Sequence, residues 1–260
     1  GGWSAASDVS KRQAFILVLV RVSGIIATAP VFGSSNIPPQ IKVVLSLMLA
    51  LILYPFIPLI TVYPDRPDHY IMLIASEMLI GLVLGIIARF LFGAVEFAGT
   101  VIGFQMGLGM AMVFDPQSQE QISLVGRFEN TTATLIFLAM DGHLIVLQAL
   151  VRSYSVLPPG GASISRPLVE NLTELSASVF VIGLQIGAPL IVALFLANAV
   201  VGLLARSVPQ IQVFVVGFPL TLMLGFLFLF FGMPFFAQAV HQMFEKLDTQ
   251  YFEAIKLLGG

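Results

Sequence analysis

Residues 77–107 read EMLIGLVLGIIARFLFGAVEFAGTVIGFQMG, and this stretch decides the class of fold. A helix needs about 20 apolar residues to cross a bilayer, and this stretch is longer than that. It shows no sustained period-2 alternation, the pattern typical of a β-strand. Yet Glu77, Arg89 and Glu96 interrupt it, and a charge at mid-bilayer costs roughly 2.5 to 3.5 kcal/mol on insertion scales. The stretch therefore predicts one overlong helix, or two in succession, whose charged positions face protein rather than lipid.

Glycines recur at every fourth residue in this stretch and again further along the chain. The sets are Gly81 and Gly85, then Gly99, Gly103 and Gly107, then Gly183 and Gly187. Residues four apart lie on one face of a helix, and small residues on that face let two helix backbones approach closely. We expect these faces to contact other helices.

The composition of the whole chain indicates a membrane protein. Hydrophobic residues make up 58% of the 260 residues, charged residues 10%, and the mean hydropathy is +0.98, which leaves too little polar surface to cover a soluble globule. With no cysteine and three histidines, a metal centre has few possible ligands, and no cofactor is expected. A net charge of −2 offers no basic face for a phosphate backbone, so nucleic acid is not an expected partner.

Six apolar stretches follow one another, separated by turns rich in glycine and proline. They cover residues 13–32, 41–63, 70–114, 124–154, 172–205 and 211–244. We expect a single all-α domain over residues 1–260, with about six or more long apolar helices arranged as membrane-associated hairpins and packed into a multi-subunit assembly. Pro189 and Pro219 lie inside two of the stretches and are expected to kink their helices.

Two further features predict local structure. Asp141, Gly142 and His143 interrupt the fourth apolar stretch. Because Asp141 and His143 would point to different faces of a helix and no further ligand is near, a helix break with a locally hydrogen-bonded histidine is favoured over acid–base chemistry or metal binding. The tail at residues 243–257 is amphipathic, with Phe244, Leu247, Tyr251 and Ile255 on one face, and predicts a helix that docks on a partner or lies at a membrane interface.

The charges inside the apolar stretches are interpreted first as ion pairs. Arg89 and Glu96 are seven residues apart, about two turns along one face of a helix, and Glu77 begins the glycine stripe that leads to Arg89. Because buried charges are usually paired, we expect Glu77, Arg89, Glu96 and Arg206 in ion pairs within or between helices. A second interpretation stays open, in which the same charges serve transport or a proton relay.

The segment from Gly99 to Gln121 is the leading functional candidate, because it passes from a glycine-spaced helix through methionines into a polar run. Methionine repacks easily and fills irregular gaps, and an apolar constriction of this kind can gate a pore by dewetting. The alternative is an ordinary helix terminus followed by an Asp-Pro turn.

Several short motifs, taken in order, resemble one family. They are Arg21 with APVFG at 29–33 and Ile37-Pro38; QMG at 105–107 through Met110-Ala111 to FDP at 114–116; DGH at 141–143 with Ser153 and Leu157-Pro158; and ARSVPQ at 205–210 followed by Phe214 and GFP at 217–219. Together they cover nearly the whole chain, which on this basis resembles the FliR family of export-gate proteins of the flagellar type III secretion apparatus and its injectisome counterparts.

The resemblance implies an export-gate subunit of the bacterial inner membrane and flagellar basal body. One such subunit joins several copies each of FliP and FliQ, is contacted by FlhB, and lines a channel for unfolded flagellar proteins, with lipid around it and no catalysis. The resemblance also implies a plug that obstructs the closed pore. Its residues here are Gly107, Gly109, Met110, Met112, Phe114, Asp115, Pro116 and Gln117, with Met110, Met112 and Phe114 expected to occlude the channel.

The main alternative is a secondary transporter for a small solute. In that case Glu77, Arg89, Glu96 and Asp141 would line a site near the middle of the membrane. An intramembrane enzyme is disfavoured, because no nucleophile with a suitably placed base can be found in the sequence.

Overall fold

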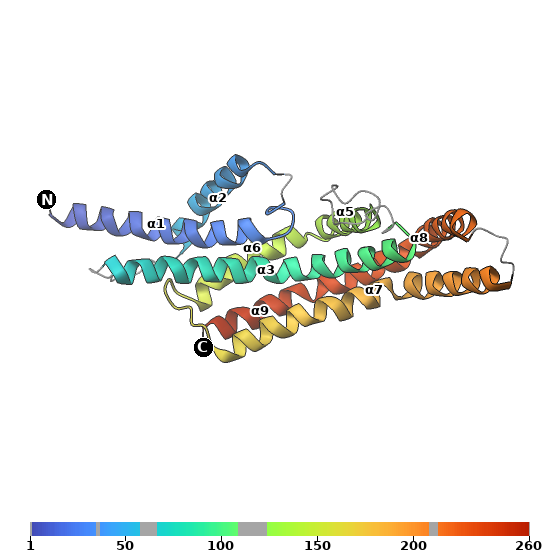
Figure 1. The fold of residues 1–260 in the computed structure, drawn as a ribbon. Helices are drawn as coiled ribbons and strands as arrows, with labels where there is room; N and C mark the ends of the chain where they lie inside the picture. The colour runs from blue at the N-terminus through green and yellow to red at the C-terminus, as the bar shows by residue number, and fades with distance from the viewer. Residues whose placement is uncertain (1, 35–36, 58–66, 109–123, 208–212, 260) are drawn as a thin grey trace. The chain divides into compact units, whose positions relative to one another are not determined.

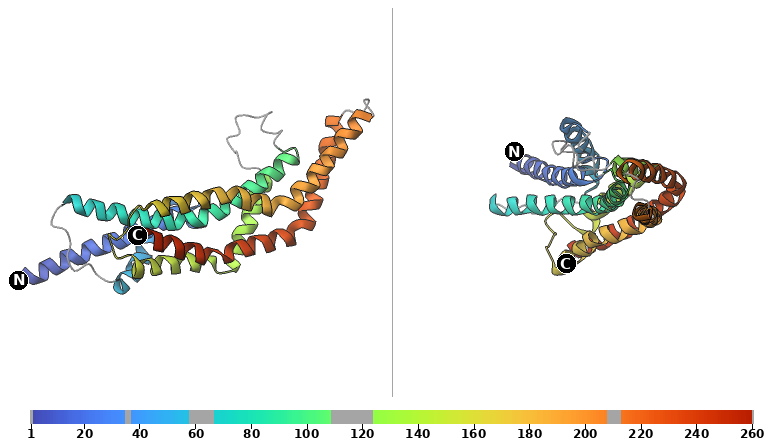
Figure 2. Two further views of the ribbon diagram at one scale, coloured as in Figure 1. Left: turned by 90° about the horizontal axis from the view of Figure 1, so that it is seen from below. Right: turned by 45° about the vertical axis from the view of Figure 1, so that its right-hand side comes forward.

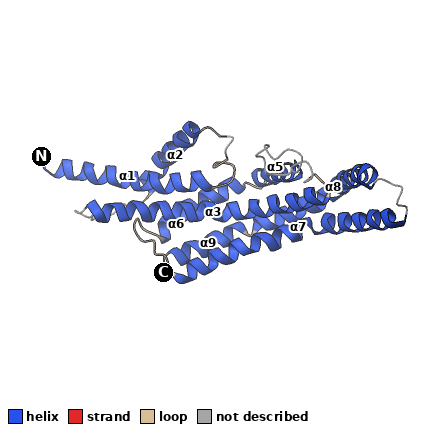
Figure 3. Cartoon of the chain, in the orientation of Figure 1, coloured by secondary structure: helices blue, strands red, loops and turns tan. Residues whose placement is uncertain are grey.

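The computed structural model describes residues 2–34, 37–57, 67–108, 124–207 and 213–259. These residues are mostly helical and contain no strand (Figures 1 and 3), which confirms the all-α prediction. The elements are α1 (Gly2–Thr28), α2 (Pro39–Leu53), the 3₁₀ turn η1 (Tyr54–Phe56), α3 (Pro67–Gln105), α5 (Leu124–Ala139), α6 (Gly142–Val156), α7 (Arg166–Ser207), α8 (Val213–Glu245) and α9 (Leu247–Leu258).

Helix lengths follow the local sequence signals. α3 is one helix of 39 residues, so the longest apolar stretch forms one element rather than two. The fourth stretch divides into α5 and α6 at Asp141, which adopts a left-handed φ of 57°, a region that Asp enters more readily than most residues. The predicted helix break is confirmed, but among the described residues Nδ1 of His143 is buried without a hydrogen-bond partner, so the local hydrogen bond predicted for this histidine is not found at that atom. Pro189 lies inside α7, and Pro219 and Pro234 lie inside α8.

Four of the described helical segments are long and apolar enough to cross a membrane, or five spans result if α5 and α6 form one broken span. The four are Pro39–Phe56, Asp68–Gln105, Arg166–Leu204 and Gly217–Leu258. This is slightly below the six or more long helices that hydropathy predicts. One reason is that α5 and α6 have 16 and 15 residues, and neither alone reaches the about 20 residues of a span.

The chain forms two compact units. Unit 1 contains residues 1–90, 141–175 and 246–260, and unit 2 contains residues 91–140 and 176–245. α3 and α7 each contribute residues to both units. Each unit is described by itself below.

In unit 1, α1 packs closely against the first half of α3. Gly24 of α1 and Gly81 of α3 face each other so closely that a Cβ atom on Gly24 would lie 3.1 Å from the Cα atom of Gly81. One turn further on, Gly85 lies against Thr28. The glycine stripe of α3 thus removes the side-chain bulk that would keep the two backbones apart.

The C-terminal helix α9 completes unit 1 by packing on α6, and Figure 2 shows the two helices alongside each other. Its apolar face is buried, with Leu247, Tyr251 and Ile255 at most 2% exposed. Ser165 also donates a hydrogen bond to the carbonyl oxygen of Leu257 at 3.0 Å. The prediction that this face docks on a partner or a membrane interface is therefore wrong, because the chain's own helices already bury it.

In unit 2, aromatic rings and small residues fill the contacts between helices. The rings of Phe92, Phe137 and Phe244 lie within 5.1–5.4 Å of one another, centroid to centroid, and join α3, α5 and α8. Gly183 of α7 lies against the carbonyl oxygen of Ala94 in α3, where a Cβ atom would approach to 2.6 Å. Close helix packing in unit 2 therefore also depends on glycine.

The α1–α3 contact predicts the effect of adding one methyl group. In Gly81→Ala the new Cβ atom would collide with the backbone carbonyl of Arg21, so we expect a loss of about 1 to 3 kcal/mol in the free energy of unfolding. Gly93 is the matched control on α3, since its Cβ would meet its nearest atom at 3.7 Å. Gly93→Ala should be neutral or stabilising by up to about 1 kcal/mol. Thermal unfolding in detergent, followed by circular dichroism, measures both; equal shifts would contradict the contact.

Candidate functional site

α3 ends in a defined capping motif just before the predicted functional segment. Gly107 has a left-handed φ of 84°, the amide N–H of Leu108 donates to the carbonyl oxygen of Gly103 at 3.0 Å, and the N–H of Gly107 donates to that of Phe104 at 3.0 Å. This pair of bonds around a left-handed glycine is a Schellman motif, which satisfies carbonyl groups left over at a helix end. Gly107 therefore stops α3 and turns the chain toward residues 109–123.

Side chains from α7 and α8 hold this helix end in place. Asn198 of α7 donates from Nδ2 to the carbonyl oxygen of Gln105 at 3.0 Å, which satisfies another carbonyl at the C-terminus of α3. On α8, the ring of Phe218 lies so close to Gly107 that a Cβ atom there would be 3.0 Å from Cδ2. Both contacts come from residues more than 90 positions further along the chain.

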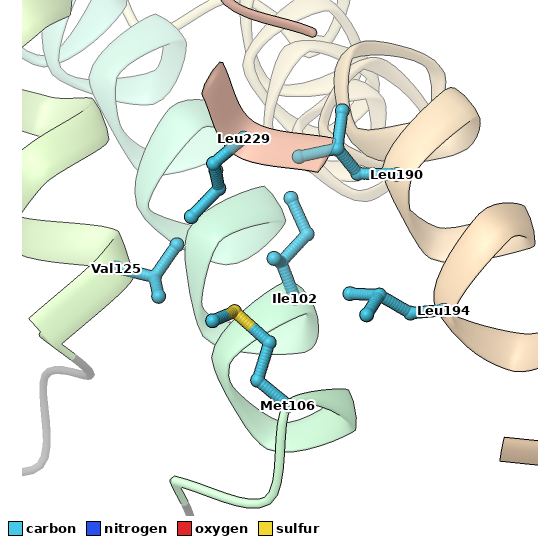
Figure 4. Close-up of a cluster of buried hydrophobic side chains, with 6 residues drawn as sticks. All are labelled: Ile102, Met106, Val125, Leu190, Leu194 and Leu229. Carbon is cyan, nitrogen blue, oxygen red and sulfur yellow. The ribbon is translucent and has the colours of Figure 1, made fainter. Parts of the chain in front are cut away.

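An apolar cluster surrounds both flanks of residues 109–123, and we call it the flanking cluster. Figure 4 shows its six buried members from α3, α5, α7 and α8: Ile102, Met106, Val125, Leu190, Leu194 and Leu229. Met106 precedes the segment and Val125 follows it, and these side chains are 0% and 2% exposed. Met106 also lies against Gly225 of α8, where a Cβ atom would approach the methionine sulfur to 2.7 Å. Both flanks of the segment are thus packed into one core.

Of the residues predicted for the plug, the structure describes Gly107. The others, namely Gly109, Met110, Met112, Phe114, Asp115, Pro116 and Gln117, lie outside the described residues, and their role stays a prediction.

A second polar site lies in unit 1, where Glu77 pairs with Arg21 of α1. Arg21 Nε donates to Glu77 Oε2 at 2.7 Å and its NH2 group donates to Oε1 at 3.0 Å. The same guanidinium donates to Ser153 Oγ at 3.0 Å and to the carbonyl oxygen of Leu157 at 3.2 Å. Glu77 Oε1 also accepts the backbone N–H of Gly160 at 3.1 Å. We call this set of contacts the Arg21 network.

The Arg21 network is fully buried and joins α1, α3, α6 and the turn after α6. The side chains of Arg21 and Glu77 are both 0% exposed, and the guanidinium carbon lies 4.0 Å from the centre of the Tyr154 ring. A two-bond arginine–carboxylate pair is among the strongest polar contacts in proteins. The polar atoms of the Arg21 network bind each other. The network therefore stabilises the packing of unit 1 and does not form an open binding site.

The other charges predicted in ion pairs are placed differently. Arg89 and Arg206 are exposed and Glu96 is half-buried. Among the described residues, the salt bridges are those of Arg21, Arg152, Arg166 and His241, so Arg89 and Glu96 do not pair with each other in this chain. Ion pairs of Arg89, Glu96 and Arg206 with other partners stay a prediction.

The predicted glycine positions lie at a helix crossing in unit 2. Gly99 is so close to α5 that a Cβ atom would lie 2.5 Å from the Cα atom of Gly126 and 2.8 Å from Glu129 Oε2. Gly103 is buried and supplies the acceptor of the capping bond described above. Sequence reasoning missed Glu129, which is 2% exposed, because it lies in a mixed polar stretch of α5 rather than alone in an apolar run.

Comparison with known proteins decides the family. A model of the family described as bacterial export proteins, family 1, matches residues 13–247. The chain belongs to this family. The chain is also similar to the flagellar biosynthetic protein FliR of Escherichia coli (strain K12), which is 35% identical over 229 residues, 88% of this chain and 87% of that protein. FliR of Bacillus subtilis (strain 168) is 34% identical over 262 residues, 97% of this chain and 98% of the relative.

A more distant relative shows the same full-length correspondence. FliR of Aquifex aeolicus (strain VF5) is 30% identical over 256 residues, 96% of this chain and 99% of that protein. The resemblance to the FliR family inferred from the sequence motifs is confirmed. Membership of export family 1, together with the apolar helices, indicates a location in a membrane. Within the described ranges, no group of three or more His, Cys, Asp or Glu side chains could hold a metal ion.

The Arg21 network predicts a strong asymmetry between single and double substitutions. Arg21→Met leaves Glu77 buried without its cation, so we expect a loss of about 3 to 5 kcal/mol in the free energy of unfolding. Arg21→Met with Glu77→Met should recover much of that loss, because no charge then stays buried. The control is Arg152→Met, which breaks the exposed pair with Asp248 and should cost less than about 1 kcal/mol. Chemical unfolding in detergent tests this, and equal effects of Arg21→Met and Arg152→Met would refute it.

The capping motif predicts that Gly107 resists substitution. Gly107→Ala forces an L-residue into a left-handed conformation at a cost of about 1 to 2 kcal/mol and pushes its Cβ atom toward Phe218. Gly202→Ala on α7 is the control, since a Cβ atom there would meet nothing within 4 Å. We expect a lower midpoint of thermal unfolding for Gly107→Ala and an unchanged or higher one for Gly202→Ala. The same midpoint in both variants would show that the cap contributes nothing.

Proposed function

We propose that the chain is a subunit of a flagellar type III protein export gate, in which it joins several copies of FliP and FliQ and lines the channel for unfolded flagellar proteins. We propose further that the segment from Gly107 to Gln121 supplies an apolar plug for this channel. The gate would lie in the bacterial inner membrane, at the flagellar basal body, with FlhB as a further contact.

One observation carries the plug proposal: both flanks of residues 109–123 are anchored in the flanking cluster. The Schellman motif at Gly107 and the buried Met106 hold one flank, and Val125 holds the other. A segment that obstructs a pore needs fixed ends. If its ends were free, the whole segment could move out of the pore and would no longer obstruct it. The flanking cluster meets that requirement with side chains from four helices.

The exposed surface of the long helices supports a role within an assembly. In the most apolar part of the candidate span Arg166–Leu204, 28% of the residues are buried, and in that of Gly217–Leu258 the share is 22%. Large side chains remain exposed on α8, with Met223 at 73% and Phe230 at 74%. Exposed apolar surface of this extent needs partner helices or lipid to cover it. This agrees with a chain that reaches its working form beside other helical subunits.

The alternative of a secondary transporter receives no comparable support. Glu77, one of the four charges expected at its substrate site, already binds Arg21 with both carboxylate oxygens and accepts the N–H of Gly160 as well. Arg89 and Asp141 are exposed. A substrate ammonium group would have to break the Arg21 network to reach Glu77, at a cost of several kcal/mol.

The plug proposal predicts a leaking gate when the segment is shortened. Deletion of Met110 to Gln117 should leave assembly with FliP and FliQ intact, because Met106 and Val125 remain, while ion leakage through the reconstituted complex rises. The readouts are co-purification of the three proteins and ion flux in liposomes.

Point substitutions separate the occluding side chains from the length of the segment. Met110→Ser, Met112→Ser and Phe114→Ser together should reproduce the leak, because they remove apolar bulk at constant length. Gln119→Ser with Gln121→Ser is the matched control and should stay closed. An assembled gate that stays closed with the deletion and with the triple substitution would remove the plug from the proposal and leave the subunit assignment intact.

A further inference from the structure

Unit 1 contains a cavity between α1 and α2 that the gate function does not use. Its volume is about 330 Å³. Leu19 and Ile26 of α1 line one side, Val43 and Leu47 of α2 line the other, and Lys42 lies among them. We call this cavity the α1–α2 groove.

The walls of the α1–α2 groove suit hydrocarbon rather than water. Its two serine hydroxyl groups are already committed to their own helices: Ser23 donates to the carbonyl oxygen of Leu19 at 2.6 Å and Ser46 to that of Lys42 at 2.8 Å. An apolar cavity of roughly 150 Å³ in a protein stays dry and accepts a small hydrocarbon ligand. The α1–α2 groove, at about 330 Å³, has room for part of an acyl chain. It is too small for a partner helix, which with its side chains is about 10 Å across.

Lys42 adds a positive charge to this apolar groove. Its Nζ donates to the carbonyl oxygen of Gly33 at 3.0 Å, and the side chain is half-buried. An ammonium group has three N–H donors, so two remain for another acceptor. In the part of the chain that the structure describes, no carboxylate forms a salt bridge with Lys42. Among the described residues, the positive charge of Lys42 in the groove therefore has no carboxylate partner.

The position of Lys42 relative to α2 indicates which anion. Lys42 is in the first turn of α2, at one end of the candidate membrane span Pro39–Phe56, of which only 11% is buried. A lysine near the end of a spanning helix places its charge at the level of the lipid headgroups. Val43 and Leu47 line the groove and are also 58% and 37% exposed, so the groove opens onto the apolar surface of α2.

We propose that the α1–α2 groove binds one anionic phospholipid, with its phosphate on Lys42 and one acyl chain between α1 and α2. A charged headgroup joined to a hydrocarbon chain matches both halves of the groove at once. The lipid would also cover the apolar face of α2 beside the groove. This site is independent of the segment 109–123.

A photoreactive amino acid in place of Leu47 tests the occupant directly. The chain, co-purified with FliP and FliQ, is placed in nanodiscs that contain equal amounts of phosphatidylglycerol and phosphatidylcholine, irradiated, and analysed by mass spectrometry. We expect adducts with phosphatidylglycerol to exceed those with phosphatidylcholine about fivefold, the preference that one lysine near a membrane surface provides. A ratio near one would overturn the proposal.

Two lysine variants connect the preference to the groove. Lys42→Gln should bring the adduct ratio close to one, while Lys11→Gln, which removes an exposed lysine from α1 two turns before the groove, should leave it unchanged. Lys42→Arg keeps the charge and should keep the preference. An unchanged ratio in Lys42→Gln would overturn the assignment of the phosphate to Lys42. In cell membranes, adducts at position 47 with a polypeptide rather than with lipid would show that a partner protein fills the groove and would also overturn the proposal.

Discussion

The buried guanidinium of Arg21 is the contact on which the packing of unit 1 depends. Four of its five N–H donors have partners, on Glu77, Ser153 and the carbonyl oxygen of Leu157, and its face lies on Tyr154. In surroundings of low polarity a buried charge is tolerated only when it is paired and hydrogen-bonded in this way. Glu77 also begins the stripe that continues through Gly81. Hence the ion pair and the close glycine contact specify the same register of α1 on α3.

At the C-terminal end of α3, polar groups satisfy backbone carbonyl groups instead of a buried charge. A helix that stops among apolar side chains leaves carbonyl groups without partners. Here the N–H groups of Gly107 and Leu108 and the amide of Asn198 satisfy three of them. Because these bonds satisfy the carbonyl groups, the chain can leave α3 beside the fully buried Met106 without placing unpaired polar backbone in the core. α3 therefore carries the buried ion pair of Glu77 near its N-terminal end, in unit 1, and a hydrogen-bonded capping motif at its C-terminal end, in unit 2.

Local patterns in the sequence predict the helices well and their distant contacts poorly. The all-helical class, the break at Asp141 and the amphipathic face of Tyr251 follow from periodicity over a few residues. The partner of Glu77 is 56 residues away, and no spacing rule reaches it. For Arg89 the stripe argument fails for a geometric reason: each step of four residues turns about 40° around the helix, so three steps from Glu77 rotate Arg89 about 120° away. Arg89 accordingly lies on the exposed side of α3.

The paired buried charges and the exposed apolar surface bear on the choice between a self-contained transporter and the proposed subunit. A transporter that works alone would keep charges free at an internal site and show lipid a smooth apolar exterior. In this chain the buried charges of Arg21 and Glu77 are not free, since they are paired with each other. Its exposed apolar side chains, such as Phe230 and Phe231 of α8 at 74% and 70%, offer a surface that partner helices or lipid can cover. Pro219 and Pro234 inside α8 also free backbone carbonyl groups, which are tolerated in a membrane where neighbouring helices or local adjustments satisfy them. Helices with these properties are suited to packing against the helices of other subunits.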